Sequence, residues 1–590
     1  MEKVTRKGDL GILWRILKRA RPYTLRVLIA TALALVLAPL RSLAPYIINQ
    51  LVDVFTQGSI AEEILKWVLI YISVMVLQVL VEYVFVYGTE WLGQRIVLDL
   101  RNELFDRLLD YKMRYFDQTP IGKNTTRVIS DIETLGLVFT RQGLTMIVAD
   151  LFSIFAVLYL MLITSVKLTL ICVGTIPLML IATYIFKEKV KLSFEIVRKK
   201  ISEMNSFLQE RISGMKTIQV MNVEEREGKV YKALNKAYTK ANLNTIQYYA
   251  VFFPVVEIIS SFALALMIWL GAGGVVKGEL TLGVLVAFPM YVNRLFRPIR
   301  FLADKFNNVQ MAMVASKRVF SLLDKEEYLE DTGEQSLVGF KGQVEFEHLY
   351  FSYDGQQDVL KDISFFIPAG STTAIVGATG SGKTSIINII CKLYEYHRGH
   401  ARIDGIEIKT LNNETLRRHL GIVLQDVFLF TGSILDNIRL RDQSISKQKV
   451  IDAARSIGAH EIIEHFPDQY DHILQERGAN LSVGQRQLIA FVRVLVFDPT
   501  LLILDEATSS IDTMTERVIQ KAIDKLTKDR TTIIIAHRLA TIKNSNQVIV
   551  LDKGRIVEHG QYDELVQTSD GYFKKLYDMQ FQTSVGEALS

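Results

Sequence analysis

Long apolar runs dominate the first half of the chain and are absent from the second half. A membrane-spanning helix needs about 20 mostly apolar residues. Six stretches of that kind occupy residues 24–51, 67–88, 143–163, 167–186, 250–276 and 282–302. Residues 164–166 alone join the third stretch to the fourth, and residues 277–281 join the fifth to the sixth. Links this short predict tight hairpins on one side of the membrane.

The connections after the second and fourth stretches are long and polar, at residues 89–142 and 187–249. They contain helix-compatible runs at residues 95–110 and 201–220. Unstructured loops of such length are uncommon in compact proteins. The sequence therefore predicts that helices continue beyond the bilayer here, and that residues 303–324 form a helix leading out of the membrane.

Lysine and arginine indicate how the chain crosses the membrane. They are frequent in the long connections and in the N-terminal lead, which carries Lys3, Arg6, Lys7, Arg15, Lys18, Arg19 and Arg21, whereas the short hairpins have only Lys66, Lys167 and Lys277 nearby. Such residues favour the cytoplasmic side. We therefore expect a multi-pass protein of the cell membrane with its N-terminus, long connections and C-terminal half in the cytoplasm. Residues 11–21 read as a basic amphipathic helix at the interface, or as a solvated basic leader.

Beyond residue 342, strand-like and helical patterns alternate. The predicted strands are residues 343–346, 372–376, 421–424, 501–504, 531–535 and 547–551. This alternation favours a mostly parallel sheet covered by helices. The sequence thus predicts a helical membrane domain over residues 1–324, a polar linker over 325–342, an α/β domain over 343–582 and a tail over 583–590.

Composition excludes some functional classes. Apolar residues make up 49% of the 590, and the net charge is only +5. No dense basic stripe with interleaved aromatic residues is present, so nucleic acid is not an expected partner. The two cysteines, Cys172 and Cys391, fall in different predicted compartments, so we expect no disulfide. The first apolar run is too long for a signal peptide and reads as a retained anchor.

A phosphate-binding motif provides the first chemistry. It comprises Gly377, Ala378, Thr379, Gly380, Ser381, Gly382, Lys383 and Thr384, followed by Ser385. The motif matches G-x-x-x-x-G-K-[ST] and lies between an apolar strand and a helical run, which is the context that a P-loop requires. Its backbone amides would hold the phosphates of ATP. Lys383 would reach the β- and γ-phosphates, and Thr384 would ligate Mg²⁺.

A second motif is the buried strand of residues 501–504 that ends in Asp505 and Glu506. Adjacent residues on a strand point in opposite directions. The pair can therefore divide the work, with Asp505 at the Mg²⁺ ion and Glu506 at the attacking water.

A third motif identifies a family. Leu481, Ser482, Val483, Gly484 and Gln485 resemble the signature of ATP-binding cassette (ABC) proteins, at the expected place before Asp505. Six spans followed by one cassette resemble the bacterial ABC exporters that include multidrug pumps and lipid A flippases, over essentially the whole chain. The resemblance implies the ABC exporter fold, with a six-helix all-α membrane domain and a cytosolic α/β P-loop ATPase.

The resemblance also implies roles for single residues. Tyr353 would stack on adenine, and Gln425 would contact Mg²⁺ or water and report the nucleotide state. Ser482 and Gly484 would face the γ-phosphate bound by the opposite subunit. His537 would order Glu506, and Asp512 would belong to the D-loop. Glu506, His537 and Lys383 form the implied catalytic set, and Thr384, Gln425 and Asp505 the implied Mg²⁺ set.

Two departures from the common family pattern bear on assembly. Val483 replaces the more frequent glycine, and the D-loop reads Ser-Ser-Ile-Asp over residues 509–512. Both resemble one subunit type of heterodimeric multidrug exporters, the type that keeps its catalytic glutamate. We therefore expect a second half-transporter as partner, with a heterodimer favoured over a homodimer. A homodimeric lipid flippase is the alternative, and an ATP-gated channel or regulatory subunit is the alternative from another class.

The membrane domain offers less specific signals. Residues 115–131 resemble the family's first cytosolic loop with its coupling helix, and the second coupling helix is expected near residues 207–220. The alternative is exposed helix with no mechanical role. Charged residues inside the predicted spans are Arg41, Glu82, Asp150, Glu257 and Arg294. Glu82, Asp150 and Glu257 either attract cationic amphiphiles into a transport cavity or brace neighbouring helices, and bracing is the favoured interpretation. The expected cargo is a hydrophobic or amphipathic drug or lipid, which no motif names further.

Overall fold

The computed structural model describes residues 6–58, 61–140, 143–328, 333, 335, 339–505, 513–535 and 542–578. The catalytic candidates Glu506 and His537, the D-loop Asp512 and the predicted tail lie outside these residues. Internal contacts divide the chain into two units. One consists of residues 1–109 with 120–326, and the other of residues 110–119 with 327–590.

The first unit is helical. Its long helices are α2 (Thr24–Thr56), α3 (Ala61–Leu109), α7 (Leu144–Thr164), α8 (Val166–Ser213), α10 (Glu224–Val276) and α11 (Leu282–Leu323). Its short elements are α1 (Arg6–Lys18), η1 (Arg21–Tyr23), α5 (Ile121–Thr126), the π-helix η2 (Arg127–Asp131), α6 (Ile132–Gly136), η3 (Leu137–Phe139) and α9 (Met215–Val220). Each predicted apolar stretch falls within one of the long helices, except that the third begins one residue before α7, at its N-cap Gly143.

Five of the predicted spans lie in segments that are long and apolar enough to cross a membrane, judged by length and composition over the described residues. These segments contain α2, α3, α7, α8 and α10. The sixth predicted span lies in the first half of α11, where Asn293, Arg294 and Arg297 interrupt the apolar run. This sixth crossing therefore stays a prediction.

The helices continue well beyond the predicted apolar stretches, as expected for the long connections. α10 has 53 residues, which at 1.5 Å per residue is about 80 Å, against about 30 Å of hydrocarbon. α8 is only slightly shorter. Ser165 is the single residue between α7 and α8, and its side chain caps α8 by accepting a hydrogen bond from the Leu168 amide. Thr281 caps α11 in the same way.

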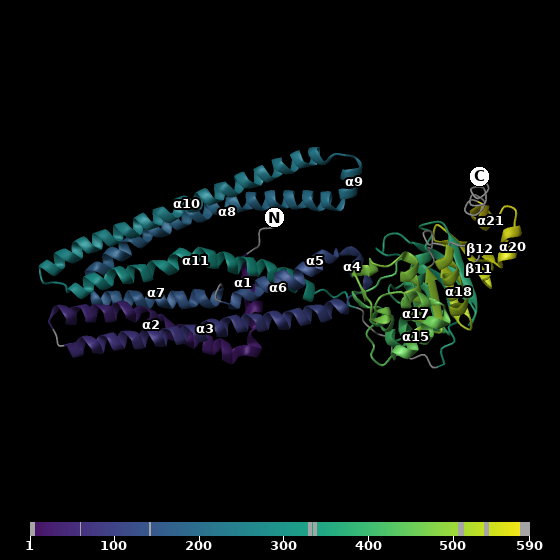
Figure 1. Cartoon of the computed structure of the whole chain (residues 1–590), viewed down its shortest axis with the longest axis horizontal. Helices are drawn as coiled ribbons and strands as arrows, with labels where there is room; N and C mark the ends of the chain where they lie inside the picture. Colours follow the sequence, from purple (N-terminus) through teal and green to yellow (C-terminus); the bar gives the residue numbers. More distant parts are fainter. Residues whose placement is uncertain are drawn as a thin grey trace. The chain divides into compact units, whose positions relative to one another are not determined.

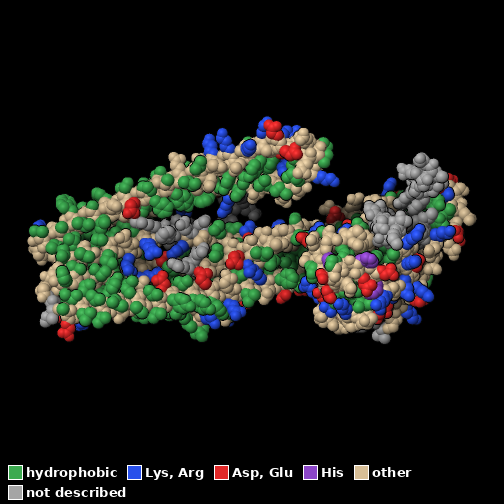
Figure 2. All heavy atoms as spheres, in the orientation of Figure 1, with side chains coloured by type: hydrophobic (Ala, Val, Ile, Leu, Met, Phe, Trp, Pro, Cys, Tyr) green, Lys and Arg blue, Asp and Glu red, His purple; other side chains and the backbone are tan. Residues whose placement is uncertain are grey.

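Packing divides the long helices into two groups. α8 lies along α10, and α9 joins their ends, which stand away from the other helices in Figure 1. α2 packs on α3 and α7, and α11 packs on α2 and α7. Apolar side chains cover much of the visible face of these helices in Figure 2. An apolar exterior is what a lipid-facing surface requires.

The second unit is α/β. Its main sheet has the order β12-β11-β3-β10-β9-β6, in which all neighbours are parallel except β11 and β12. The strands are β3 (Thr372–Gly377), β6 (Leu420–Val423), β9 (Leu501–Asp505), β10 (Thr531–Ile535), β11 (Gln547–Asp552) and β12 (Arg555–Gly560). β10 is buried along its whole length, as expected for a central parallel strand covered on both faces.

A second sheet accompanies the mostly parallel sheet that the sequence predicts. Its order is β2-β1-β4-β5 and all its pairs are antiparallel. The strands are β1 (Val344–Phe351), β2 (Leu360–Ile367), β4 (Arg398–Ile403) and β5 (Ile406–Glu407). The predicted strand 343–346 is the start of β1 and belongs here. A further short pair is β7 (Gly432–Ser433) with β8 (Ile473–Leu474).

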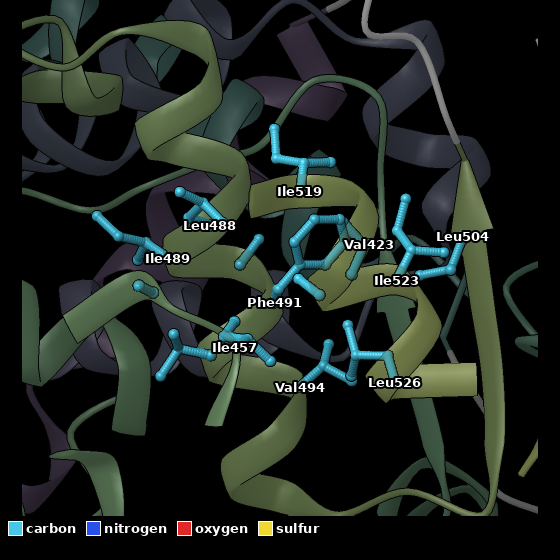
Figure 3. Packing of buried hydrophobic residues seen from close by; sticks show 14 of the residues in the cluster. Val423, Ile457, Leu488, Ile489, Phe491, Val494, Leu504, Ile519, Ile523 and Leu526 are labelled. Carbon is cyan, nitrogen blue, oxygen red and sulfur yellow. The ribbon is translucent and has the colours of Figure 1, made fainter. Parts of the chain in front are cut away.

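Helices complete the second unit. They are α4 (Met113–Gln118), α12 (Lys383–Ile390), α13 (Asn413–Arg418), α14 (Ile434–Arg439), α15 (Lys447–Ser456), α16 (Ala459–Glu464), α17 (Val483–Phe497), α18 (Thr513–Thr527), α20 (Tyr562–Gln567) and α21 (Tyr572–Tyr577). Single 3₁₀ turns are η4 (Ile408–Thr410), η5 (Gln469–Asp471) and η6 (Glu476–Gly478). Figure 3 shows Leu488 and Phe491 of α17 in one apolar cluster with Ile519 and Ile523 of α18. This cluster fixes the position of α17.

Candidate functional site

The predicted P-loop has the conformation that its glycines allow. β3 ends at Gly377, and α12 begins at Lys383. Between them the backbone is left-handed at Gly380, with φ +82°, and at Gly382, with φ +107°. A Cβ atom on Gly382 would lie 2.6 Å from a methyl carbon of Leu360, whereas one on Gly380 would meet no atom within 4 Å. The loop therefore needs glycine at 382 for both conformation and space.

Lys383 lies folded against its own loop. Its Nζ atom donates hydrogen bonds to the backbone oxygens of Gly377, at 2.7 Å, and Ala378, at 3.1 Å. Burial lowers the pKa of Lys383, and the charge of Asp505 acts in the opposite direction. An ammonium group held this way lies at the start of α12, where amide groups and the helix dipole favour an anion.

The hydroxyl groups of the loop differ in their surroundings. The Ser381 Oγ atom is buried and, among the described residues, has no hydrogen-bond partner. Thr384 is exposed at the start of α12. Ser385 is buried, and its Oγ atom lies 3.0 Å from the hydroxyl of Tyr353. The loop therefore offers one unsatisfied and one exposed hydroxyl next to the lysine.

Tyr353, the predicted adenine-stacking residue, is tied to the same helix. Besides Ser385, its hydroxyl accepts a hydrogen bond from Asn388 Nδ2 at 3.0 Å. Its ring meets Phe351 edge-on at 4.6 Å between centroids, and Tyr394 at 4.8 Å. The side chain is half-buried, so part of it stays accessible. Sequence reasoning missed Asn388 and Tyr394, because neither belongs to a motif.

Asp505 and Gln425 lie at the same edge of the main sheet as the P-loop. Asp505 is the last residue of β9, and Gln425 is exposed two residues after β6. β3, β9 and β6 run in the same direction through the sheet. Their carboxyl ends therefore meet at one edge, which is where ligands bind in such sheets. The effect of Asp505 on the Lys383 pKa agrees with this arrangement.

The predicted signature forms the start of α17. Ser482 is its N-cap and forms a capping box with Gln485. The Gln485 amide donates to Ser482 Oγ at 3.2 Å, and the Ser482 amide donates to Gln485 Oε1 at 2.9 Å. Arg486 donates to the Leu481 backbone oxygen at 2.9 Å and steadies the preceding turn. Gly484 is buried, whereas Val483 is 38% exposed.

The residues present fit a nucleotide with Mg²⁺. The buried Ser381 hydroxyl, which has no hydrogen-bond partner among the described residues, is available to a phosphate oxygen. The exposed Thr384 hydroxyl is available to the metal ion. Among the described residues no group of three or more His, Cys, Asp or Glu side chains could hold a metal. Mg²⁺ binds through one or two carboxylates and the phosphates of its nucleotide, and Asp505 ends β9 with a carboxylate at this edge of the sheet.

Three of the charged residues predicted inside the spans, Arg41, Glu82 and Asp150, form ion pairs. Glu82 accepts a hydrogen bond from Arg41 at 2.7 Å, joining α3 to α2. Asp150 is buried and forms an ion pair with Lys305, joining α7 to α11. Glu257 is exposed on α10. Two of the three candidate cavity acids thus connect neighbouring helices.

Comparison with known proteins decides the family. The ABC transporter transmembrane region matches residues 27–299, and the ABC transporter cassette matches residues 360–509. An uncharacterized ABC transporter ATP-binding protein of Bacillus subtilis, YknV, is 36% identical over 582 residues, which cover 97% of this chain and 95% of the relative. The chain belongs to the ABC transporter family. This half-transporter carries one membrane region and one ATP-binding region, and its ATPase is coupled to transport.

Two further relatives have functional names. The probable multidrug resistance ABC transporter protein YheH of B. subtilis is 37% identical over 509 residues, 84% of the half-transporter and 74% of the relative. An ATP-dependent lipid A-core flippase of Syntrophus aciditrophicus is 32% identical over 583 residues, 98% and 96% of the two chains. Half-transporters of this family work as dimers, so the site described above is one half of a working unit.

Proposed function

We propose that this chain is the ATP-hydrolysing half of an exporter that moves hydrophobic or amphipathic compounds out of the cytoplasm or its facing leaflet by alternating access. The observation that carries the ATPase proposal is the P-loop with Lys383 in place at the edge where Asp505 ends β9. ATP would bind with its phosphates on the amides that start α12 and its adenine against Tyr353. Mg²⁺ would neutralise phosphate charge, held through Thr384, Gln425 and Asp505.

The chemistry assigned to the protein is positioning and charge stabilisation. Lys383 exchanges the carbonyl oxygens of its own loop for phosphate oxygens when ATP binds. Glu506 orients the attacking water, and His537 holds Glu506 and the γ-phosphate in line. Ser482, with Gly484 behind it, presents the start of α17 to the γ-phosphate in the other chain's P-loop. Each nucleotide then needs both chains, so ATP closes two cassettes together.

Two segments are assigned to mechanical coupling. α4, with residues 110–119, belongs to the cassette unit by its contacts. Asp117 of α4 accepts a hydrogen bond from Tyr394, and Lys112 lies 3.4 Å from Glu395. α9 joins α8 to α10, and Val220 at its end is 71% exposed. An exposed apolar side chain outside the bilayer suits docking on the partner's cassette.

A heterodimer is favoured over a homodimer. Val483 and the Ser-Ser-Ile-Asp sequence of residues 509–512 support this assignment, as does the multidrug name of one relative. The flippase names of other relatives favour the alternative, a homodimeric lipid flippase. The basic N-terminal lead and the basic long connections support a membrane domain in the cell membrane with the cassette on its cytoplasmic side.

Helix bracing is the role proposed for Glu82 and Asp150. Each has a cation as its partner on a neighbouring helix, and an ion pair in the membrane lowers the cost of burying the charge. Glu257 is exposed on α10 and stays a candidate for contact with cationic cargo.

ATPase activity in proteoliposomes tests the proposal. The chain is assayed alone and with the product of any adjacent similar gene, and Glu506→Gln is the matched inactive control. Turnover by the chain alone supports a homodimer, and turnover only with the partner supports a heterodimer. Bound ATP without Glu506-dependent turnover in either setting overturns the pump proposal in favour of a channel or regulatory subunit.

A further inference from the structure

Two cavities adjoin the N-terminal helix α1, and neither belongs to the nucleotide site. The first has a volume of about 770 Å³ and is lined mainly by apolar side chains of α2, α3, η3 and α7, such as Val27, Leu92 and Phe139. The second, of about 810 Å³, lies between the α1–η1 segment and α3, and its lining mixes six charged side chains with apolar ones such as Ile96 and Leu100. Both volumes lie within the roughly 300–1,000 Å³ of small-molecule sites.

The same three residues line both cavities. Trp14, Lys18 and Arg21 belong to each, so a mainly apolar space and a space with charged walls meet along α1 and η1. Trp14 is 72% exposed. Tryptophan with lysine or arginine is the residue combination that proteins place at the level of lipid headgroups. α2, the first span, begins only a few residues later at Thr24.

The cations of this region separate into two kinds. Arg15 pairs with Asp324 at 2.5 Å, and Arg19 pairs with Glu103 at 2.5 Å. Within the part of the chain that the structure describes, Lys18 and Arg21 form no ion pair. The acids of the polar cavity are already engaged, Glu103 by Arg19 and Asp99 by the Tyr23 hydroxyl at 2.7 Å. Four basic side chains, Arg15, Lys18, Arg19 and Arg21, thus line this cavity against two acidic ones, Asp99 and Glu103, and positive charge is in excess there.

We propose that these two cavities form a binding site for one anionic phospholipid of the surrounding leaflet. An acyl chain fills the apolar cavity, and the phosphate lies against Lys18 and Arg21. Charge complementarity selects this occupant, because unpaired basic groups at the membrane surface attract anionic headgroups by about 1 kcal/mol each. None of the residues proposed for ATP binding lines either cavity, so the lipid would have a role other than that of nucleotide.

Lipid titration followed by native mass spectrometry tests the site on the detergent-purified full-length chain. The probes are phosphatidylglycerol and phosphatidylcholine with the same acyl chains. The first phosphatidylglycerol should bind about 30-fold more tightly than phosphatidylcholine. Lys18→Gln/Arg21→Gln should remove that preference. The matched control Lys232→Gln/Lys236→Gln removes two exposed cations of α10 and should keep it.

Two further arms separate the acyl chain from the headgroup. Thr31→Trp places bulk at the wall of the apolar cavity and should weaken the first binding event for both lipids. Glycerol phosphate, which has the charge without the chains, should not compete. Equal affinity for the two lipids, an unchanged preference in the Lys18/Arg21 variant, or an equal loss in the control variant overturns the proposal. Competition by glycerol phosphate would also overturn it, because the site would then bind free phosphate.

Nucleotide binding provides the check on folding. Lys18 and Arg21 are exposed and unpaired in the described structure, so their replacement should leave ATP affinity unchanged. Because the lipid assay needs no turnover, its failure is distinguishable from a failure of the exporter proposal.

Discussion

Alanine substitutions at two glycines of the P-loop can distinguish the cost of backbone strain from the cost of a steric clash. Gly380→Ala meets open space and costs only the strain of a left-handed residue, about 1–2 kcal/mol. Gly382→Ala adds a contact of 2.6 Å with Leu360, so it should cost clearly more and displace the start of α12. We expect ATP affinity to fall much further for Gly382→Ala, measured with a fluorescent nucleotide, and thermal unfolding to rank the two variants in the same order. Equal losses would contradict a steric role for position 382.

At Tyr353, the contributions of the aromatic ring and of the hydroxyl group to ATP binding can be tested separately. Phenylalanine keeps the stacking surface and removes only the hydrogen bonds to Ser385 and Asn388, each a contribution of about 1 kcal/mol. Tyr353→Phe should therefore change ATP affinity a few-fold, whereas Tyr353→Ala should lower it by more than tenfold. The readout is the dissociation constant for ATP compared with that for inorganic triphosphate. Triphosphate binding should be nearly the same in all three proteins if the ring contacts adenine.

At the scale of elements, Ser482 caps α17 and is also proposed to face the γ-phosphate in the other chain. Substitutions at this one residue can test the two roles separately. Aspartate caps helices about as well as serine, whereas alanine costs about 1 kcal/mol. Ser482→Asp should therefore keep the thermal stability that Ser482→Ala loses. The added negative charge would repel a γ-phosphate, so Ser482→Asp should abolish ATPase activity. An active Ser482→Asp protein would show that this helix end does not meet nucleotide.

Tyr394 connects the Tyr353 ring to Asp117 of α4. Burial and the hydrogen bond to Asp117 raise the pKa of Tyr394, so the hydroxyl stays protonated and keeps donating at neutral and mildly alkaline pH. Tyr394→Phe should leave ATP affinity near normal and reduce the stimulation of ATPase by transported compounds. The control is Tyr396→Phe, which removes the hydroxyl bonded to Glu407 within the same unit. A similar effect of both variants would indicate a general loss of stability instead.

The sequence predicted the elements that carry strong periodic or motif signals. The limits of β10 agree with the prediction, and β3, β9 and β11 differ by one residue, because buried parallel strands read as continuous apolar runs. The sequence did not predict β2 and β4. Buried and exposed positions alternate along both strands, so neither reads as a continuous apolar run, and their pairing in the antiparallel sheet is what defines them. Lys383, Ser482 and Asp505 could be named from spacing. Asn388 and Tyr394 could not, because their contacts with Tyr353 exist only in the folded unit.

At the scale of the whole molecule, the proposed closure of two cassettes predicts a contact that one chain cannot make. If Ser482 of one chain faces the P-loop of the other, cysteines at Ser482 and Thr379 should be joined between chains by a short bis-maleimide. The reaction should require ATP and should be strongest in a Glu506→Gln background, which holds the closed state. The natural cysteines should not interfere, because both are buried and burial raises the pKa of Cys391 to about 12.

The pattern of cross-linked products then distinguishes the assemblies. A homodimer has two equivalent contacts between its chains. The variant that carries both cysteines should therefore form cross-links between two copies of itself. In a heterodimer that chain should link only to a partner with matching cysteines, and each single-cysteine variant reports one of the two nucleotide sites. Cross-linking that is equally strong without ATP would place the two cassettes together permanently. Closure could then not be the step that ATP drives, and the alternating-access proposal would have to be abandoned.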